Sequence, residues 1–418
     1  MRIPVMNNLP NKRKIINDPV YGLITLPNKL VFEIIEHPWF QRLRRILQLG
    51  LTHYVYPSAV HTRFQHALGA MHLMTQAVEV LKSKGISISE EEEEGVLCAI
   101  LLHDIGHGPY SHALEQTMVK DLSHEDLSLL IMDSLNDLLN HRLDIANKIF
   151  RNDYQKKFLH QLVSSQLDVD RLDYLSRDSF FTGVAEGVIN TDRIIKMLTV
   201  ADDQLVVEAK GIYSIEKFII ARRLMYWQVY LHKTVIAAEY MLVNILKRAK
   251  ELASEDIPLF GSPVLHLFLY SNIRIEHFLE ERKWIGDFAK LDDYDILSAI
   301  KVWITHPDPI LSWLCKNLVD RHLYKVEIQN GPFDKEYLAL LKDKTATQFR
   351  VSIKEIGYFV VEGTLTNNAY NPKHDRIRIQ FRNNELIDVS EASDQLNISV
   401  LSTPVNKYLL CYPKNLVI

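Results

Sequence analysis

A single stretch of the chain, residues 101–112, combines three histidines with a carboxylate. It reads LLHDIGHGPYSH and includes His103, Asp104, His107 and His112. Imidazole and carboxylate groups hold zinc, manganese, iron or magnesium ions in proteins. Because such clusters are typical of metal or catalytic sites, we favour that interpretation over ordinary polar residues at the end of a helix.

The apolar run before this stretch predicts the helix that positions it. Residues 95–102 read GVLCAILL. Neighbouring residues on a helix diverge by about 100°, so His103 and Asp104 can reach one ion only near the end of that helix. The two glycines and the proline that follow provide that end, because these residues terminate helices.

A second chemically dense stretch spans residues 166–183, QLDVDRLDYLSRDSFFTG. If it is helical from Asp170, it presents two polar stripes, which are Arg171, Tyr174 and Asp178, and beside them Asp170, Asp173 and Arg177. The first stripe offers a cation to a phosphate, an aromatic ring to a sugar or base, and a carboxylate to a hydroxyl. Simple surface ion pairing is the alternative. Asp170 is then free to complete a metal site.

Other histidines lie at predicted helix starts. His61, Arg63 and His66 crowd the start of an amphipathic helix ahead of the His-Asp pair, which favours a functional role for them. His124 follows Ser123 in a predicted N-cap turn. It is either a residue of the capping turn or a catalytic acid or base.

Two further helical segments carry cations. Residues 42–45, RLRR, form a basic cluster that is either a solvated helix face or a contact to a phosphate or nucleotide. A long helical pattern over residues 212–252 carries Arg222 and Tyr230, although its aromatic stripe is more typical of a core than of a ligand site.

Composition excludes several classes of protein. The 418 residues are 47% hydrophobic and 24% charged, as in ordinary globular proteins, and the net charge of −4 gives no basic excess for nucleic acid. The three cysteines are widely spaced and form neither a disulfide framework nor a CxxC metal pair. The N-terminus is polar and proline-broken, and no apolar run is long enough for a membrane span. We therefore expect a cytoplasmic protein without membrane partners.

The hydrophobic pattern changes near residue 320. Helical periodicity dominates before it, whereas four later segments alternate apolar and polar residues as strands do: 324–328, 349–353, 358–361 and 377–381. We expect a mainly α protein, with a helical catalytic core over residues 1–320, its metal motif within residues 61–178, and a smaller C-terminal α/β region over residues 321–418.

His66, the pair His103-Asp104 and Asp170 together resemble the H…HD…D pattern of the HD-domain phosphohydrolases, which are metal-dependent enzymes on a helical fold. Several longer segments are similar to those of the deoxynucleoside triphosphate (dNTP) triphosphohydrolases, which include the human SAM-and-HD-domain enzyme. These segments are INDPVYGLI, EHPWFQRLRRILQLG, HTRFQHALG, LLHDIGHGPYSH, SHED and DVDRLDYLSRD. The resemblance extends from about Asn17 to about Lys233.

This resemblance implies an enzyme that cleaves a dNTP at its α-phosphorus and releases the deoxynucleoside and inorganic triphosphate. The implied ligands of a divalent metal, whether Fe, Mn, Zn or Mg, are His66, His103, Asp104 and Asp170. The metal would lower the pKa of a water molecule and polarise the α-phosphate. The implied proton-transfer histidines are His107, His112 and His124, and Glu115 matches a carboxylate that orients one of them.

The resemblance also implies a set of substrate contacts. Arg63 and Arg171 match residues that contact phosphates in the family, and Tyr174 and Asp178 match residues that contact the sugar. Gln48 and Leu49 match the pair packed against the deoxyribose. Arg222 and Tyr230 match further base and sugar contacts. One position departs from the pattern. The human enzyme has a glutamine after the matching tyrosine, whereas this chain has Leu231, which affects base or sugar selectivity more than the chemistry.

Regulated members of the family bind an activating guanine nucleotide at a subunit interface. Gln41 and Arg44 match two of the residues involved, Glu36 replaces an aspartate, and Arg193 matches a phosphate-binding arginine. On this resemblance we expect a homotetramer activated by GTP, dGTP or another dNTP. The alternative is that this helix is simply buried and ion-paired.

Two other functions stay open at this point. The first is an HD-domain phosphomonoesterase or phosphodiesterase that acts on other nucleotides, such as deoxynucleoside monophosphates or cyclic nucleotides. The second is a non-enzymatic binder of nucleotides or nucleic acid that has kept the fold, and the intact ligand set argues against it.

Overall fold

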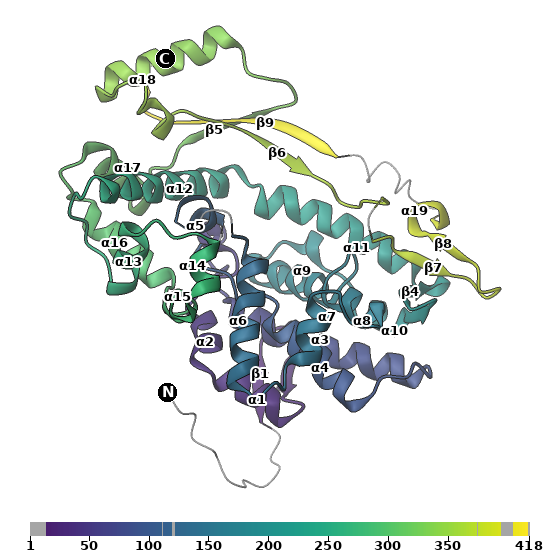
Figure 1. The fold of residues 1–418 in the computed structure, drawn as a ribbon. Helices are drawn as coiled ribbons and strands as arrows, with labels where there is room; N and C mark the ends of the chain where they lie inside the picture. The colour runs from purple at the N-terminus through teal and green to yellow at the C-terminus, as the bar shows by residue number, and fades with distance from the viewer. Residues whose placement is uncertain (1–13, 111, 119–121, 374, 394–403, 417–418) are drawn as a thin grey trace.

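The His-Asp stretch lies between the end of α4 (Glu90–Leu102) and the start of α5 (His112–Thr117), and α12 (Lys233–Ser254), from the second half of the chain, packs against α5 (Figure 1). The computed structural model describes residues 14–110, 112–118, 122–373, 375–393 and 404–416. The helices up to residue 197 are α1 (Lys29–Glu36), α2 (Pro38–Gln41), α3 (Arg63–Ser83), α4 (Glu90–Leu102), α5 (His112–Thr117), α6 (His124–Leu138), α7 (Asp144–Phe150), α8 (Lys157–Val163), α9 (Val169–Thr182) and α10 (Thr191–Met197), with 3-10 turns η1 (Arg42–Arg45), η2 (Gly50–Tyr54) and η3 (Ala185–Gly187).

The next helices extend the core toward its C-terminal side. They are α11 (Ile212–Met225), the π-helical turn η5 (Tyr226–Tyr230), α12 (Lys233–Ser254), α13 (Pro263–Tyr270), α14 (Ile275–Glu280), α15 (Arg282–Phe288), α16 (Asp293–Trp303) and α17 (Pro309–Val319). In the described ranges, no helix is both long and apolar enough to cross a membrane.

Capping residues fix where the two helices that carry the dense motifs begin. The Ser89 hydroxyl accepts a hydrogen bond from the backbone N–H of Glu92, and the Glu92 carboxylate accepts one from the N–H of Ser89, so a capping box starts α4. Asp168 caps α9 by accepting from the N–H of Arg171 at 2.7 Å. This cap places Asp170 in the first turn of α9.

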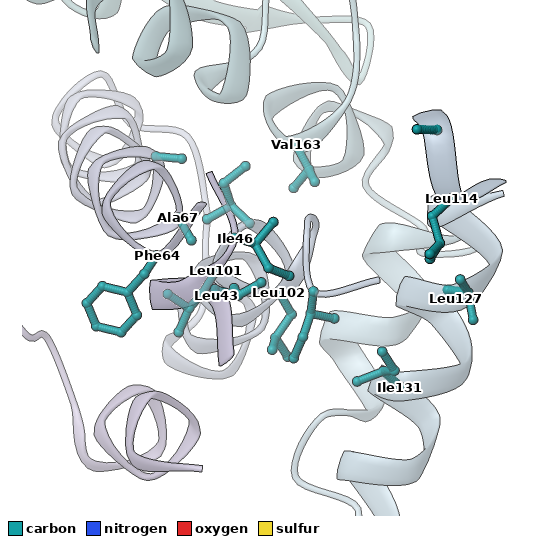
Figure 2. Close-up of a cluster of buried hydrophobic side chains, with 14 of the residues drawn as sticks. Leu43, Ile46, Phe64, Ala67, Leu101, Leu102, Leu114, Leu127, Ile131 and Val163 are labelled. Carbon is teal, nitrogen blue, oxygen red and sulfur yellow. The ribbon is translucent and has the colours of Figure 1, made fainter. Parts of the chain in front are cut away.

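Apolar side chains of α3 and α4 pack together next to the His-Asp pair. Phe64 and Ala67 of α3 and Leu101 and Leu102 of α4 are almost completely buried in one cluster (Figure 2). Since α3 packs against both α4 and α9, these contacts hold the three helices together at the level of the His-Asp pair.

Three small sheets complete the fold. β1 (Ile15–Asp18) and β2 (Gly22–Thr25) form an N-terminal hairpin. An antiparallel sheet of order β5-β9-β6 contains β5 (Lys325–Gln329), β9 (Val405–Tyr412) and β6 (Val361–Asn367), near α18 (Lys335–Phe349) and η6 (Ile356–Tyr358) (Figure 1). A third sheet, of order β3-β4-β7-β8, joins β3 (Leu198–Ala201) and β4 (Gln204–Glu208) to β7 (Arg378–Gln380), β8 (Leu386–Asp388) and the adjoining α19 (Val389–Ala392).

This arrangement confirms the mainly α fold with an α/β C-terminal region. The boundary at residue 320 stays a prediction, and the parallel pairing of β4 with β7 crosses it. The strand predicted at residues 349–353 is wrong, because Phe349 ends α18 and Arg350 adopts a left-handed conformation with φ 54°. The strand predicted at residues 358–361 is also wrong, because Tyr358 ends η6 and β6 begins only at Val361. The helical pattern over residues 212–252 is interrupted at η5, after which His232 caps α12.

Candidate metal centre

Three side chains from three different helices converge at one point. His66 comes from α3, His103 from the C-terminal end of α4 and Asp170 from the first turn of α9. The two Nε2 atoms lie 3.3 Å apart, and Oδ1 of Asp170 lies 3.0 Å from Nε2 of His66 and 3.4 Å from Nε2 of His103. These donor atoms form a group that is able to hold a metal ion.

Asp104 reaches the same two histidines. Its Oδ1 lies 3.3 Å from Nε2 of His103, and its Oδ2 lies 3.8 Å from Nε2 of His66. Asp104 also receives a hydrogen bond of 2.5 Å from Nη1 of Arg63 and lies 3.2 Å from Nε2 of His107. Both residues of the His-Asp pair therefore lie beside Nε2 of His66, while the candidate metal group among the described residues comprises His66, His103 and Asp170, and the ligand role of Asp104 stays a prediction.

The surrounding charges keep the carboxylates ionised. Burial raises the pKa of Asp104, but His103, His107 and Arg63 hold that pKa well below its ordinary value. Burial likewise raises the pKa of Asp170, while hydrogen bonds from His103 and His66 lower it overall. Two imidazole nitrogens beside two ionised carboxylates fit a divalent cation in both charge and donor type.

A second set of contacts orients the two histidines. Nδ1 of His103 donates to the carbonyl oxygen of Ile100 at 2.6 Å, and Nδ1 of His66 lies 2.7 Å from Oδ2 of Asp173. Both contacts leave Nε2 facing the cluster, as is usual for metal-ligating histidines. The interpretation of Asp173 and Arg177 as surface ion pairing is wrong, because both side chains are completely buried.

Two of the predicted catalytic histidines lie face to face beside Asp104. The rings of His107 and His124 stack with centroids 3.9 Å apart. Burial, assisted by the charge of Arg63, lowers the pKa of His107 to about 3. A Cβ at Gly106 would lie 2.2 Å from the backbone N of Ser128, so only glycine lets this loop approach α6. The side chains of His112 and Glu115 lie outside the described residues, although their backbone belongs to α5.

Half of the eight proposed substrate residues lie on α9 and η5, namely Arg171, Tyr174, Asp178 and Tyr230. The Asp178 carboxylate accepts a hydrogen bond of 2.7 Å from the Tyr230 hydroxyl and lies 2.7 Å from Nε2 of His61. The ring centroids of Tyr174 and Tyr230 lie 6.3 Å apart. Since both oxygens of Asp178 already have protein partners, the carboxylate fixes Tyr230 and His61 in place. The sequence indicates a functional role for His61, but no local signal indicates its pairing with Asp178.

Arg171 and Arg222 also have partners within the chain, and Nε of Arg171 lies 3.2 Å from Oδ2 of Asp168. Arg171 donates from Nε to the carbonyl oxygen of Ser165 at 2.6 Å, and Arg222 donates from Nη1 to that of Ala369 at 3.3 Å. Gln48 and Leu49 are half-buried beside η2. Oε1 of Gln48 and Nε of Arg222 are buried and lack a hydrogen-bond partner among the described residues, so each is suited to meet a ligand.

The candidate regulatory residues divide into two places. Gln41 accepts a hydrogen bond of 2.8 Å from Nε of Arg44, and the Arg44 guanidinium lies 3.5 Å from the Phe64 ring centroid. Glu36 is exposed at the end of α1 nearby in sequence. Arg193 belongs to α10, where its Nη2 donates to the carbonyl oxygen of Lys210 at 3.0 Å.

Comparison with known proteins relates this geometry to a family. The HD domain model matches residues 63–178, which include all four proposed ligands, and the HD associated region model matches residues 189–258. The uncharacterized protein YwfO of Bacillus subtilis is 32% identical over 425 residues, which cover 98% of this chain and 94% of that protein. The chain belongs to the HD-domain phosphohydrolase family.

Two further HD-domain relatives carry more specific names. A phosphohydrolase crystal structure from Bacteroides thetaiotaomicron is 53% identical, with a TM-score of 0.92, and covers 96% of this chain and 100% of that one. The SAMHD1 homolog of Dictyostelium discoideum, named a deoxynucleoside triphosphate triphosphohydrolase, is 30% identical over 336 residues. The matched region covers 75% of this chain and 59% of that protein. The HD-domain core is thus related to dNTP triphosphohydrolases.

Proposed function

We propose that the protein is a metal-dependent dNTP triphosphohydrolase. The main support is that the first two turns of α9 carry a proposed metal ligand, Asp170, together with Arg171 for a phosphate and Tyr174 for the sugar. A nucleoside triphosphate presents phosphates and a sugar in the same order. The buried, unpartnered Oε1 of Gln48 is suited to accept a hydrogen bond from a sugar hydroxyl.

A divalent ion held by His66, His103, Asp104 and Asp170 would supply a Lewis acid for the α-phosphate and lower the pKa of water. Arg63 and Arg171 bind phosphate oxygens, for which the guanidinium group is well suited. During hydrolysis the oxygen of water bonds to the α-phosphorus and the bond from this phosphorus to the 5′-oxygen breaks. His107, whose pKa is lowered to about 3, is neutral and suited to accept a proton, and His112 and His124 supply the proton that the 5′-oxygen takes up.

Substrate choice rests on the side chains around Tyr174 and Tyr230. Gln48 and Leu49 pack against the deoxyribose and leave no room for a 2′-hydroxyl. Asp178 keeps Tyr230 in place through its hydrogen bond. Leu231 offers no hydrogen bond where the human enzyme has a glutamine, so we propose a broader choice of bases for this chain.

The experiment is product analysis of dATP, dGTP, dCTP and dTTP hydrolysis by the full chain, with a His103→Ala/Asp104→Ala double variant as the inactive control. We expect deoxynucleoside and inorganic triphosphate from the wild type and neither product from the double variant. Orthophosphate release from deoxynucleoside monophosphates, without triphosphate from any dNTP, would favour the phosphomonoesterase instead. Equal turnover by both proteins would refute the metal centre.

We further propose that a guanine nucleotide or dNTP activates a homotetramer through Glu36, Gln41, Arg44 and Arg193. The Gln41–Arg44 hydrogen bond supports a preformed half of such a site, and Arg193 would then approach from another subunit. Hydrolysis of dATP with and without GTP or dGTP, combined with light scattering, tests this proposal. Full activity without either nucleotide, or a monomer in their presence, would contradict it.

A further inference from the structure

A chain of buried polar contacts joins the N-terminal hairpin to the metal centre. Oδ2 of Asp18, the last residue of β1, accepts a hydrogen bond of 2.7 Å from Nη1 of Arg177. Arg177 donates from Nε and Nη2 to the two oxygens of Asp173, at 2.9 and 3.0 Å. Oδ2 of Asp173 in turn lies 2.7 Å from Nδ1 of His66. Four side chains therefore form one continuous path to the proposed ligand atom of His66.

The four side chains of this path are almost completely buried, so water does not screen their charges. The side chains of His66, Asp173 and Arg177 are 0% exposed and that of Asp18 is 4% exposed. In such surroundings the loss of one partner leaves the charge of the other uncompensated. Arg177 divides its charge between two carboxylates, so the state of Asp18 decides how strongly Arg177 acts on Asp173.

Close packing leaves this path little freedom to rearrange. A Cβ at Gly69 of α3 would lie 2.0 Å from Oδ1 of Asp173 and 2.1 Å from Nη2 of Arg177. The glycine thus lets α3 and α9 approach until the ion pair fills the space between them. The side chains are held in one arrangement by this contact.

The hairpin end of the path has two separable roles. Oδ1 of Asp18 accepts from the backbone N–H groups of Val20 and Tyr21 at 2.9 and 3.0 Å and so closes the turn. Oδ2 faces Arg177. The Tyr21 ring also lies 5.5 Å from the Arg177 guanidinium. An asparagine at position 18 keeps the oxygen that closes the turn, but its NH2 group takes the place of Oδ2, so both the charge and the hydrogen bond from Arg177 are lost.

We propose that Asp18 is a positioning residue for His66 and that the N-terminal hairpin, through Arg177 and Asp173, sets the affinity of the centre for its metal. Without the charge of Asp18, Arg177 acts on Asp173 alone, which makes Asp173 a weaker acceptor for Nδ1–H of His66. A weaker acceptor makes Nε2 a poorer metal ligand. The inference rests on the metal-binding part of the proposed function and is independent of the substrate.

The test is Co²⁺ titration of the full chain after treatment with a chelator, followed by visible absorption. We expect Asp18→Asn to weaken Co²⁺ binding about tenfold and Asp173→Asn to weaken it more. Tenfold is the lower end of the loss of metal affinity that follows when a hydrogen-bond partner of a metal ligand is replaced. Asp18→Glu, which keeps the charge, should retain more of the affinity than Asp18→Asn.

The matched control is Asp308→Asn. Asp308 also accepts from an arginine, Arg248, and also caps a backbone N–H, that of Leu311, but it precedes α17 as its N-cap, and its polar contacts in the described part of the chain include none of the proposed ligands. We expect this variant to bind Co²⁺ as the wild type does. Equal affinities of Asp18→Asn and wild type, or equal losses in Asp18→Asn and Asp308→Asn, would overturn the inference alone.

If Asp18→Asn does not fold, Arg177→Lys replaces it. Lysine keeps the positive charge but cannot contact both carboxylates in the same way, so the same loss of Co²⁺ affinity is expected. Wild-type affinity in this variant would also overturn the inference. A wild-type chain that binds no Co²⁺ would refute the metal centre of the proposed function and the inference with it.

Discussion

Nη1 of Arg63 lies 2.5 Å from Oδ2 of Asp104, and the two side chains are only 9% and 11% exposed. Arg63, the proposed phosphate-binding residue, is therefore in buried contact with Asp104, a proposed metal ligand. Because α3 carries both Arg63 and His66, a movement at the start of this helix would disturb phosphate binding and metal binding together.

The first prediction concerns this contact. Arg63→Lys keeps the charge but loses the fork that can donate to Asp104 and a phosphate at once. Loss of one charge-assisted hydrogen bond costs about 1.5–3 kcal/mol, so kcat/KM for dNTP hydrolysis should fall about 10- to 100-fold. Arg248→Lys, in an arginine–aspartate pair away from the centre, should keep the wild-type value. An unchanged kcat/KM in Arg63→Lys would remove Arg63 from the phosphate site.

The second prediction concerns metal removal. An ion that binds only the folded chain stabilises it by about 2.7 kcal/mol when its concentration is a hundred times its Kd. Treatment with a chelator should therefore lower Tm as well as abolish hydrolysis, and added Mn²⁺ should restore both. In the His103→Ala/Asp104→Ala variant Mn²⁺ should leave Tm unchanged, and a rise in Tm equal to that of the wild type would place the ion elsewhere.

The third prediction concerns Gly69. Its Cβ would overlap the buried Asp173–Arg177 pair, so Gly69→Ala should lower the free energy of unfolding by about 1–3 kcal/mol, as overpacking does. Gly286→Ala is the matched control, because Gly286 also lies in a helix but a Cβ there would meet nothing within 4 Å. That variant should gain up to about 1 kcal/mol from better helix propensity. Urea unfolding measures both, and effects of the same sign would contradict the packing argument.

The fourth prediction concerns acid stability. Burial raises the pKa of Glu92, but hydrogen bonds from Lys156, the N–H of Ser89 and the Tyr154 hydroxyl bring that pKa below its ordinary value of 4.5. A carboxyl group with a lowered pKa in the folded state stabilises the fold above pH 4.5, and this stability is lost as the pH falls through the lowered pKa.

Glu92→Gln should therefore be less stable than the wild type at pH 7, by about 1–2 kcal/mol. The difference should be constant down to about pH 5 and shrink below it. Thermal unfolding of both proteins between pH 7 and pH 3 measures the difference. A gap that widens on acidification would mean that other carboxylates dominate.

Local sequence predicts the ligand-bearing segments because their signals are short-range. The apolar run before His103 and the glycines after it define a helix end, and such an end is where adjacent side chains can reach one ion. The residues that act on His66 through Asp173 cannot be found from local signals. Asp18 and Arg177 are 159 residues apart in the chain, and helical periodicity does not reveal which polar stripe is buried.

The same limit applies to the strands. The alternation at residues 377–381 predicts β7, but nothing local indicates that this strand pairs with β4, about 170 residues earlier. β9 has only the second half of its residues buried and was not predicted at all. The alternation at residues 349–353 is too short to outweigh the propensity of the preceding residues to form α18.

The sheets impose an order on folding. β7 and β8 extend the sheet that β3 and β4 begin, and β9 is the central strand between β5 and β6. The first sheet is complete only after β8 has left the ribosome and the second only after β9 has, whereas α3, α4 and α9 are synthesised long before. The helices that carry the ligands can therefore pack first, with the unpaired edges of β4, β5 and β6 exposed until β7 and β9 emerge.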